Sequence, residues 1–301
     1  MANKSGGGGC LAFLVVVGLV AFGYYYWHRG SSTSPPAGAE TGGGSGRYVA
    51  LGDSYTSAPR TGQAAGTPQG CDRSTNNYPH LVSARLKPAE FADVSCAGAT
   101  TASITEPQQT RNGTNSAQLD AVTAATTLVT LGIGGNDVGF VGLASQCSTT
   151  HADSAQCRDR FTAGGRDQLA ERVDATAGKV ASVLQKIHEK APKARVVVVG
   201  YPTVLPDGNG CWPTLPVGSG DVKYLRESLG KLNTMLAAQA KAHGAGFADT
   251  ATPGKGHDLC AAADKRWVEG LFPASPAAPL HPNARGEQGM AEAVEGLLKL
   301  P

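Results

Sequence analysis

The stretch YVALGDSY, residues 48–55, joins a short apolar run to a small polar turn. Four apolar residues in succession, with an aromatic and a β-branched residue among them, indicate a buried strand that ends at Gly52. Ser54 then lies where the chain leaves the strand, which is a position suited to presenting a nucleophile. The tripeptide Gly-Asp-Ser is also ordinary turn chemistry, so by itself it assigns no function.

Similar apolar runs recur along the chain and predict further buried strands. Continuous apolar strands, as opposed to alternating ones, are typical of a parallel sheet that is covered on both faces. The runs are residues 128–131 (LVTL), 195–199 (RVVVV), 246–248 (GFA) and, more weakly, 93–96 (DVSC).

Between these runs, apolar residues recur at helical spacing and form one stripe on each predicted helix. Strands that alternate with such helices predict an α/β fold, a doubly wound three-layer α/β/α domain with a parallel sheet of about five strands. Ligands of such folds bind beyond the carboxyl ends of the strands. The stripes are Leu169, Val173, Val180, Leu184 and Ile187; Val222, Leu225, Leu229, Leu232 and Leu236; and Met290, Val294 and Leu297.

The amino-terminal segment differs from the rest of the chain. Leu11–Trp27 carries no charge and is rich in Leu, Val, Phe and Tyr, so it predicts a membrane-inserting segment. It fits a cleaved signal peptide, with small residues at 37–39 as the cleavage site, or an uncleaved anchor. We therefore expect a signal peptide or membrane anchor in residues 1–29, a flexible linker of mostly small and polar residues in 30–46, and one folded domain in 47–301.

Six cysteines follow the amino-terminal segment. Their even number, without a close Cys-x-x-Cys pair, favours disulfides over a metal site and points to an oxidising, extracytoplasmic compartment. Residues 59–77 and 138–163 are rich in small polar residues and hold cysteines, which predicts stapled loops near a site. Sequential pairing closes the smallest loops and is the pairing we expect: Cys71–Cys96, Cys147–Cys157 and Cys211–Cys260.

The charge of the chain bears on its partners. With 26 Lys plus Arg against 24 Asp plus Glu, the formal net charge is +2. No run of basic residues is interleaved with aromatics, which argues against a nucleic-acid partner. We expect a monomer.

Two further polar motifs follow apolar segments. Residues 132–137 (GIGGND) depart from a dinucleotide-binding loop because the last position is Asp137 instead of Gly or Ala. Asn136 either donates its side-chain amide to an oxyanion or belongs to an Asn-Asp turn.

His281 begins the motif His-Pro-Asn just ahead of the last predicted helix. Histidine suits a general base because it exchanges its proton near neutral pH.

Gly-Asp-Ser-Tyr at 52–55, Gly-x-Asn-Asp at 134–137 and His-Pro-Asn at 281–283 occur in the order found in the GDSL/SGNH hydrolase family, which the chain resembles from Tyr48 to Leu300. Its six cysteines resemble the pattern of secreted actinobacterial lipases and esterases. The resemblance implies the SGNH hydrolase fold, with a flavodoxin-like sheet, and the activity of a serine ester hydrolase.

Carried over by position, the resemblance makes Ser54 the nucleophile and His281 the base. It makes the Ser54 N–H, the Gly98 N–H and the Asn136 side chain the donors to the oxyanion. The expected reaction is acyl transfer through an acyl-enzyme, with no metal and no organic cofactor.

One position departs from the family. The acid that usually lies three residues before the histidine is replaced by Ala278. The resemblance to secreted members implies that a backbone carbonyl, that of Ala278, accepts the second imidazole proton and so orients the ring. A remote carboxylate, Asp249 or Asp258, stays an alternative.

The substrate is less defined by the sequence than the reaction. The resemblance favours lipid or short-to-medium acyl esters, phospholipids included, with possible membrane association through residues 11–27. A carbohydrate O-acetylesterase and a non-catalytic envelope protein that binds a glycan or lipid are the alternatives. A set of apolar residues near Asn136 and His281 either lines an acyl pocket or packs in the core: Val138, Phe140, Val141, Leu143, Pro279 and Leu280.

Overall fold

The computed structural model describes residues 46–300, and these belong to one compact unit. The predicted membrane segment at 11–27, the signal peptide or anchor at 1–29 and nearly all of the predicted linker lie outside the described residues. Within residues 46–300, no helix is long and apolar enough to cross a membrane.

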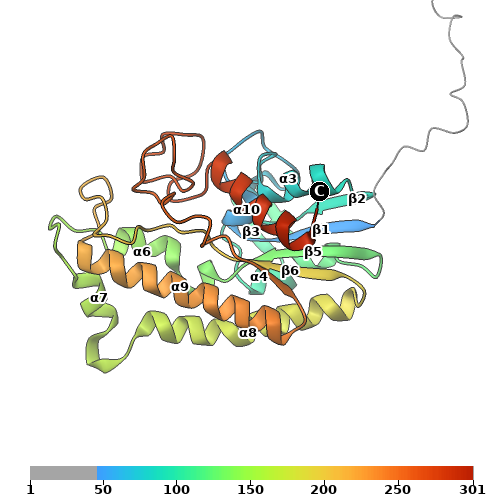
Figure 1. Cartoon of the computed structure of the whole chain (residues 1–301). Helices are drawn as coiled ribbons and strands as arrows, with labels where there is room; N and C mark the ends of the chain where they lie inside the picture. Colours follow the sequence, from blue (N-terminus) through green and yellow to red (C-terminus); the bar gives the residue numbers. More distant parts are fainter. Residues whose placement is uncertain (1–45, 301) are drawn as a thin grey trace, which may run out of the picture. The chain divides into compact units, whose positions relative to one another are not determined.

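A parallel five-stranded sheet forms the centre of the described unit (Figure 1). Its strand order is β2-β1-β5-β6-β7, the order of a flavodoxin-like sheet, so the predicted fold class is confirmed. The strands are β1 (Arg47–Gly52), β2 (Glu90–Asp93), β5 (Thr126–Gly132), β6 (Arg195–Val199) and β7 (Gly246–Ala248).

The edge strand β2 starts and ends earlier than predicted. It pairs with β1 from Glu90 to Asp93, where Phe91 stacks on Tyr48 with ring centroids 5.0 Å apart. Residues 94–96 still run beside β1, because Val94 and Cys96 donate their N–H groups to β1 carbonyls. Residues 90–93 carry no continuous apolar run, so the sequence pattern does not mark them as a strand, whereas the contact of Phe91 with Tyr48 stabilises them beside β1.

Helices cover both faces of the sheet, as Figure 1 shows. Side chains of β1 alternate between two cores, with Val49 in one and Tyr48 in the other. α8 (Gln168–Lys190) and α9 (Ser219–Ala242) pack together over the first core. α3 (Tyr78–Leu86) and α10 (Ala284–Leu298) pack over the second.

A third core lies outside the sheet and is built by α6 (Phe140–Gln146), α7 (Gln156–Phe161) and the amino-terminal part of α9. Residues 138–163 were predicted to be a loop, and this prediction is wrong because their few apolar side chains, such as Leu143 and Phe161, are buried in that core and stabilise short helices. The remaining elements are α2 (Ser54–Ser57), α4 (Ala102–Thr105), α5 (Gly135–Val138), β3 (Gln108–Thr110), β4 (Gly113–Asn115) and the 3₁₀ turns Gln69–Cys71, Gln118–Ala121 and Ala163–Gly165.

Three disulfides brace the segments around the carboxyl ends of the strands. They are Cys71–Cys96, Cys147–Cys157 and Cys211–Cys260, the same pairs that the sequence analysis expects. The second joins α6 to α7, and the third joins the segment after β6 to the segment after β7.

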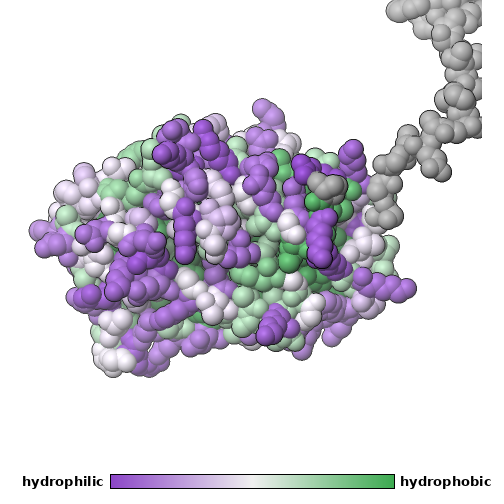
Figure 2. Space-filling model, in the orientation of Figure 1, coloured by the Kyte–Doolittle hydropathy of each residue, from purple (hydrophilic) through white to green (hydrophobic). Residues whose placement is uncertain are grey.

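The surface in the view of Figure 2 is mostly hydrophilic, with hydrophobic residues gathered beside the carboxyl-terminal end of α10. Leu297 and Leu298 there are partly buried and pack against the core of that face. Among residues 46–300, the large hydrophobic side chains that are exposed are Val141, Trp212 and Phe272.

Candidate active site

Ser54 begins α2 directly beyond the carboxyl end of β1. The side chain of Asp53 caps this helix by accepting the Tyr55 N–H at 2.9 Å. Gln118 holds the end of β1, because its side chain accepts the N–H of Gly52 at 2.7 Å and donates to the carbonyl of Gly52 at 2.9 Å. The serine is therefore presented from a turn that is fixed on both sides.

His281 lies at the start of the segment that leads into α10. Asn283 caps that helix by accepting the N–H groups of residues 285 and 286. Buried Glu269 fastens the segment, since it accepts the Asn283 side-chain amide at 2.7 Å and donates its backbone N–H to the carbonyl of His281 at 3.0 Å. The imidazole Nε2 then lies 2.8 Å from Ser54 Oγ, although 227 positions separate the two residues.

The other imidazole nitrogen, Nδ1, lies 2.7 Å from the backbone carbonyl oxygen of Pro279. The expectation that Ala278 supplies this carbonyl is wrong, because the Ala278 carbonyl accepts the backbone N–H of His281 instead. The reason is the left-handed backbone of Leu280, with φ +64°, which forms a tight turn and brings the ring back over the nearer carbonyl.

The two remote carboxylates that were alternatives for this contact are bonded elsewhere. Asp249 accepts hydrogen bonds from the Thr252 N–H and hydroxyl, at 3.1 and 2.5 Å. Asp258 accepts the backbone N–H of Cys260 at 2.9 Å. Within the part of the chain that the structure describes, the Nδ1 partner of His281 is thus a backbone carbonyl.

This arrangement decides the tautomer of His281. A carbonyl oxygen only accepts hydrogen bonds, so Nδ1 carries the proton and Nε2 offers its lone pair to the Ser54 hydroxyl. Burial lowers the pKa of the imidazole below its ordinary value of 6.5, and the Pro279 carbonyl partly opposes this by stabilising the protonated ring. His281 is therefore neutral at neutral pH, which a general base requires.

The three donors that the sequence analysis expects lie in the segments that follow the carboxyl ends of β1, β2 and β5. Across residues 46–300, the backbone N–H groups of Ser54 and Gly98 have no hydrogen-bond acceptor. Gly98 adopts φ +78°, a conformation that favours glycine. The amide nitrogen of Asn136 donates one proton to the Ala99 carbonyl at 2.9 Å, which leaves its second proton for a substrate oxygen.

Asp137 joins the two segments that carry these donors. Its carboxylate accepts the Thr101 N–H at 2.9 Å and the Thr101 hydroxyl at 2.6 Å, and it pairs with Lys179 of α8 at 3.3 Å. The Gly98 loop is thereby fastened to the helix that holds Asn136. The motif Gly-x-Asn-Asp contained this residue, but the sequence analysis gave it no role.

Two tyrosines that the sequence analysis did not single out complete the site. The hydroxyl of Tyr55 donates to the Leu280 carbonyl at 2.7 Å, and its ring lies 5.2 Å from the His281 ring. The hydroxyl of Tyr201 donates to Asp53 at 2.5 Å. Burial raises the pKa of the Asp53 carboxyl to about 7, while the Tyr201 hydroxyl and the Tyr55 N–H act in the opposite direction.

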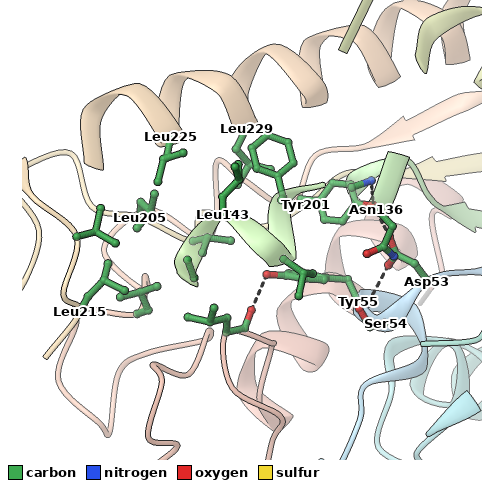
Figure 3. A pocket seen from close by; sticks show the side chains of 18 residues that line it. Asp53, Ser54, Tyr55, Asn136, Leu143, Tyr201, Leu205, Leu215, Leu225 and Leu229 are labelled. Carbon is green, nitrogen blue, oxygen red and sulfur yellow. Dashed lines mark hydrogen bonds between the residues drawn. The ribbon is translucent and has the colours of Figure 1, made fainter. Parts of the chain in front are cut away.

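A cavity runs from Ser54 between α6 and α9, as Figure 3 shows. Leu205 and Leu215 lie at its far end, and Leu143 lies between them and the serine. Of the predicted acyl-pocket residues, Phe140, Val141, Leu143 and Leu280 line the cavity, whereas Val138 and Pro279 are not among its lining residues. Val138 is fully buried in the main core, which is the alternative that the sequence left open.

The side chains that commonly bind metals are not clustered in residues 46–300. Within that range, no cluster of three or more His, Cys, Asp or Glu side chains is arranged to hold a metal ion.

The chain is similar to known hydrolases over most of its length. A model of the GDSL-like lipase/acylhydrolase family matches residues 50–288. Lipase 2 of Streptomyces coelicolor is 37% identical over 260 residues, which cover 84% of this chain and 86% of that lipase. The lipase of Streptomyces rimosus is 32% identical over 241 residues, with coverage of 80% and 82%.

Solved structures agree with these relatives. Phospholipase A1 from Streptomyces albidoflavus superimposes with a TM-score of 0.71 at 30% identity, covering 83% of this chain and 98% of that one. The extracellular lipase from Streptomyces rimosus gives 0.70 at 28% identity, with 83% and 99% covered. The chain therefore belongs to the GDSL-like lipase/acylhydrolase family and is a carboxylic ester hydrolase.

Proposed function

We propose that this protein is an extracytoplasmic serine hydrolase of lipid-type acyl esters that works through an acyl-enzyme on Ser54. The observation that carries the proposal is the 2.8 Å contact between Ser54 Oγ and His281 Nε2 at one end of a cavity whose other walls are mostly apolar. Both groups are nearly buried, so the contact is shielded from water.

In the first step, His281 Nε2 takes the hydroxyl proton as Ser54 Oγ attacks the ester carbonyl carbon. The carbonyl oxygen becomes an oxyanion that is stabilised by the Ser54 N–H, the Gly98 N–H and the Asn136 amide. The protonated imidazole keeps its orientation through the Pro279 carbonyl and gives its proton to the departing alcohol. An acyl-enzyme remains.

In the second step, a water molecule replaces the alcohol. His281 takes a proton from this water, which attacks the acyl-enzyme carbonyl, and the same donors stabilise the second oxyanion. Collapse of that intermediate releases the carboxylic acid and returns the proton to Ser54.

The cavity favours an acyl chain over an acetyl group. Its walls are formed mainly by leucines and valines from α6, α9 and the segment after β6, and they include the rings of Phe140 and Tyr201. Each methylene group that enters such a cavity contributes about 0.8 kcal/mol of binding. A carbohydrate O-acetylesterase would not use this space.

Two observations support the proposed extracytoplasmic setting. The structure contains three disulfides, and disulfides form and persist mainly in oxidising compartments outside the cytoplasm. The uncharged segment at 11–27, which lies outside the described residues, would direct export as a signal peptide or hold the enzyme at the membrane as an anchor.

Hydrolysis of nitrophenyl butanoate by the full chain tests the proposal. We expect Ser54→Ala to abolish turnover, and Ser57→Ala to serve as the matched control, because Ser57 lies in the same short helix and its buried hydroxyl has no partner among residues 46–300. Asn136→Ala should lower kcat by about a hundredfold or more. Full activity in Ser54→Ala would favour the non-catalytic alternative, with another protein responsible for the turnover.

A further inference from the structure

The hydroxyl of Tyr201 lies between the two halves of the active site. It donates to the Asp53 carboxylate at 2.5 Å and accepts the backbone N–H of Gly135 at 2.7 Å. Asp53 caps the helix that begins with Ser54, and Gly135 begins the helix that carries Asn136. One phenol oxygen therefore joins the turn of the nucleophile to the helix of the oxyanion donor.

Tyr201 is itself held in place from a third element. Asn233 of α9 accepts the backbone N–H of Tyr201 at 2.9 Å and donates to its carbonyl at 2.8 Å. The Tyr201 side chain is 5% exposed, and its ring makes an edge contact with the Tyr55 ring at 5.2 Å. The backbone of Tyr201 is thus fixed by α9, independently of the two segments that its hydroxyl joins.

The chain is fitted closely around this oxygen. α5 has no side-chain cap, so the Tyr201 hydroxyl does for Gly135 what a capping side chain does in other helices. A β-carbon on residue 135 would lie 2.9 Å from that oxygen, which only glycine avoids. Burial and the neighbouring Asp53 raise the pKa of the phenol well above its ordinary value, so the hydroxyl stays a donor.

From this geometry we infer that Tyr201 is a positioning residue for the oxyanion site: its hydroxyl sets the spacing between the Ser54 N–H and the Asn136 amide. The inference rests on the proposed function, because it assumes that these two groups bind the oxyanion. Misplacing a donor by a fraction of an ångström weakens its interaction in the transition state more than it weakens substrate binding.

Tyr201→Phe removes the hydroxyl and keeps the ring. We expect kcat for nitrophenyl butanoate to fall by about tenfold to a hundredfold, with KM changed by less than about threefold. Tyr224→Phe is the matched control, because the Tyr224 hydroxyl also donates to a helix-capping aspartate, Asp167, at 2.7 Å. Tyr224 is not among the residues that line the cavity beside Ser54. The control should keep full kcat.

A double-mutant cycle separates positioning from general loosening of the fold. If Tyr201 acts through Asn136, then Tyr201→Phe in an Asn136→Ala background should lower kcat by less than about threefold further. If Tyr201→Phe does not fold, Gly135→Ala tests the same contact, because the added methyl group displaces the phenol oxygen; it should lower kcat with KM kept.

The outcomes distinguish this inference from the proposed function. A large loss in Asn136→Ala together with unchanged kcat in Tyr201→Phe overturns the inference about Tyr201 alone. Losses that multiply fully in the double variant overturn it as well, because Tyr201 would then act independently of Asn136. An unchanged kcat in Asn136→Ala overturns the oxyanion assignment of the proposed function, and the inference with it.

Discussion

Filling the far end of the cavity should change which acyl chains the enzyme accepts. Leu215 is 3% exposed and lies, with Leu205, at the end of the cavity opposite Ser54 (Figure 3). Leu215→Trp places an indole where the end of a longer acyl chain would lie. The catalytic contacts are at the other end, so the chemistry on a short ester should be preserved.

The size of the effect follows from the apolar surface that the chain buries. Each methylene contributes about 0.8 kcal/mol, so four more of them, from butanoyl to octanoyl, contribute about 3 kcal/mol, or up to about 200-fold in kcat/KM. We expect the wild-type chain to show much of this rise. Leu215→Trp should lose most of it while its kcat/KM for butanoyl stays within about threefold of wild type.

The assay is a series of nitrophenyl esters from acetyl to dodecanoyl. Leu300→Trp is the matched control, since Leu300 is not among the residues that line the cavity, and it should keep the wild-type profile. An unchanged profile in a folded Leu215→Trp variant would refute the assignment of the cavity to the acyl chain. A wild-type chain that prefers acetyl over all longer groups would instead favour the O-acetylesterase alternative.

Two further predictions concern the histidine. Burial lowers the pKa of His281 below 6.5, and only the neutral ring is a base, so kcat/KM should persist below pH 6.5 and fall as the pH drops through the lowered pKa. The prediction is contradicted if kcat/KM already falls at or above pH 6.5 and still does so in the Asp53→Asn variant. Tyr55→Phe removes the 2.7 Å hydrogen bond to the Leu280 carbonyl, so it should lower the free energy of unfolding by about 1 kcal/mol and reduce kcat. A melting temperature and a kcat that both equal those of the wild type would count against the importance of this contact.

The sequence predicts the fold well where one periodic pattern dominates. The valines at 196–199 and the stripe from Leu169 to Ile187 are buried in the structure, and both elements lie where the patterns indicate. A parallel sheet brings the ends of its strands to one edge, which is why residues as distant as Ser54 and Asn136 can be predicted to meet.

The rest depends on contacts that no local pattern encodes. The left-handed backbone of Leu280 determines that the Pro279 carbonyl, and not that of Ala278, contacts His281 Nδ1. Leucine rarely adopts this conformation, so the sequence does not predict it. Tyr201 follows an apolar strand like any buried aromatic, and its role appears only when Asp53 and Gly135 approach it from other elements.

The central claim is that His281 activates Ser54, and the rate of covalent labelling tests it most directly. The full chain is treated with a nitrophenyl alkylphosphonate, and intact mass and peptide mapping are followed over time. We expect one adduct, on Ser54, that is absent in Ser54→Ala and forms at least about a hundredfold more slowly in His281→Ala. Labelling of Ser54 at the same rate in wild type and His281→Ala, or no adduct in the wild type, would contradict the account.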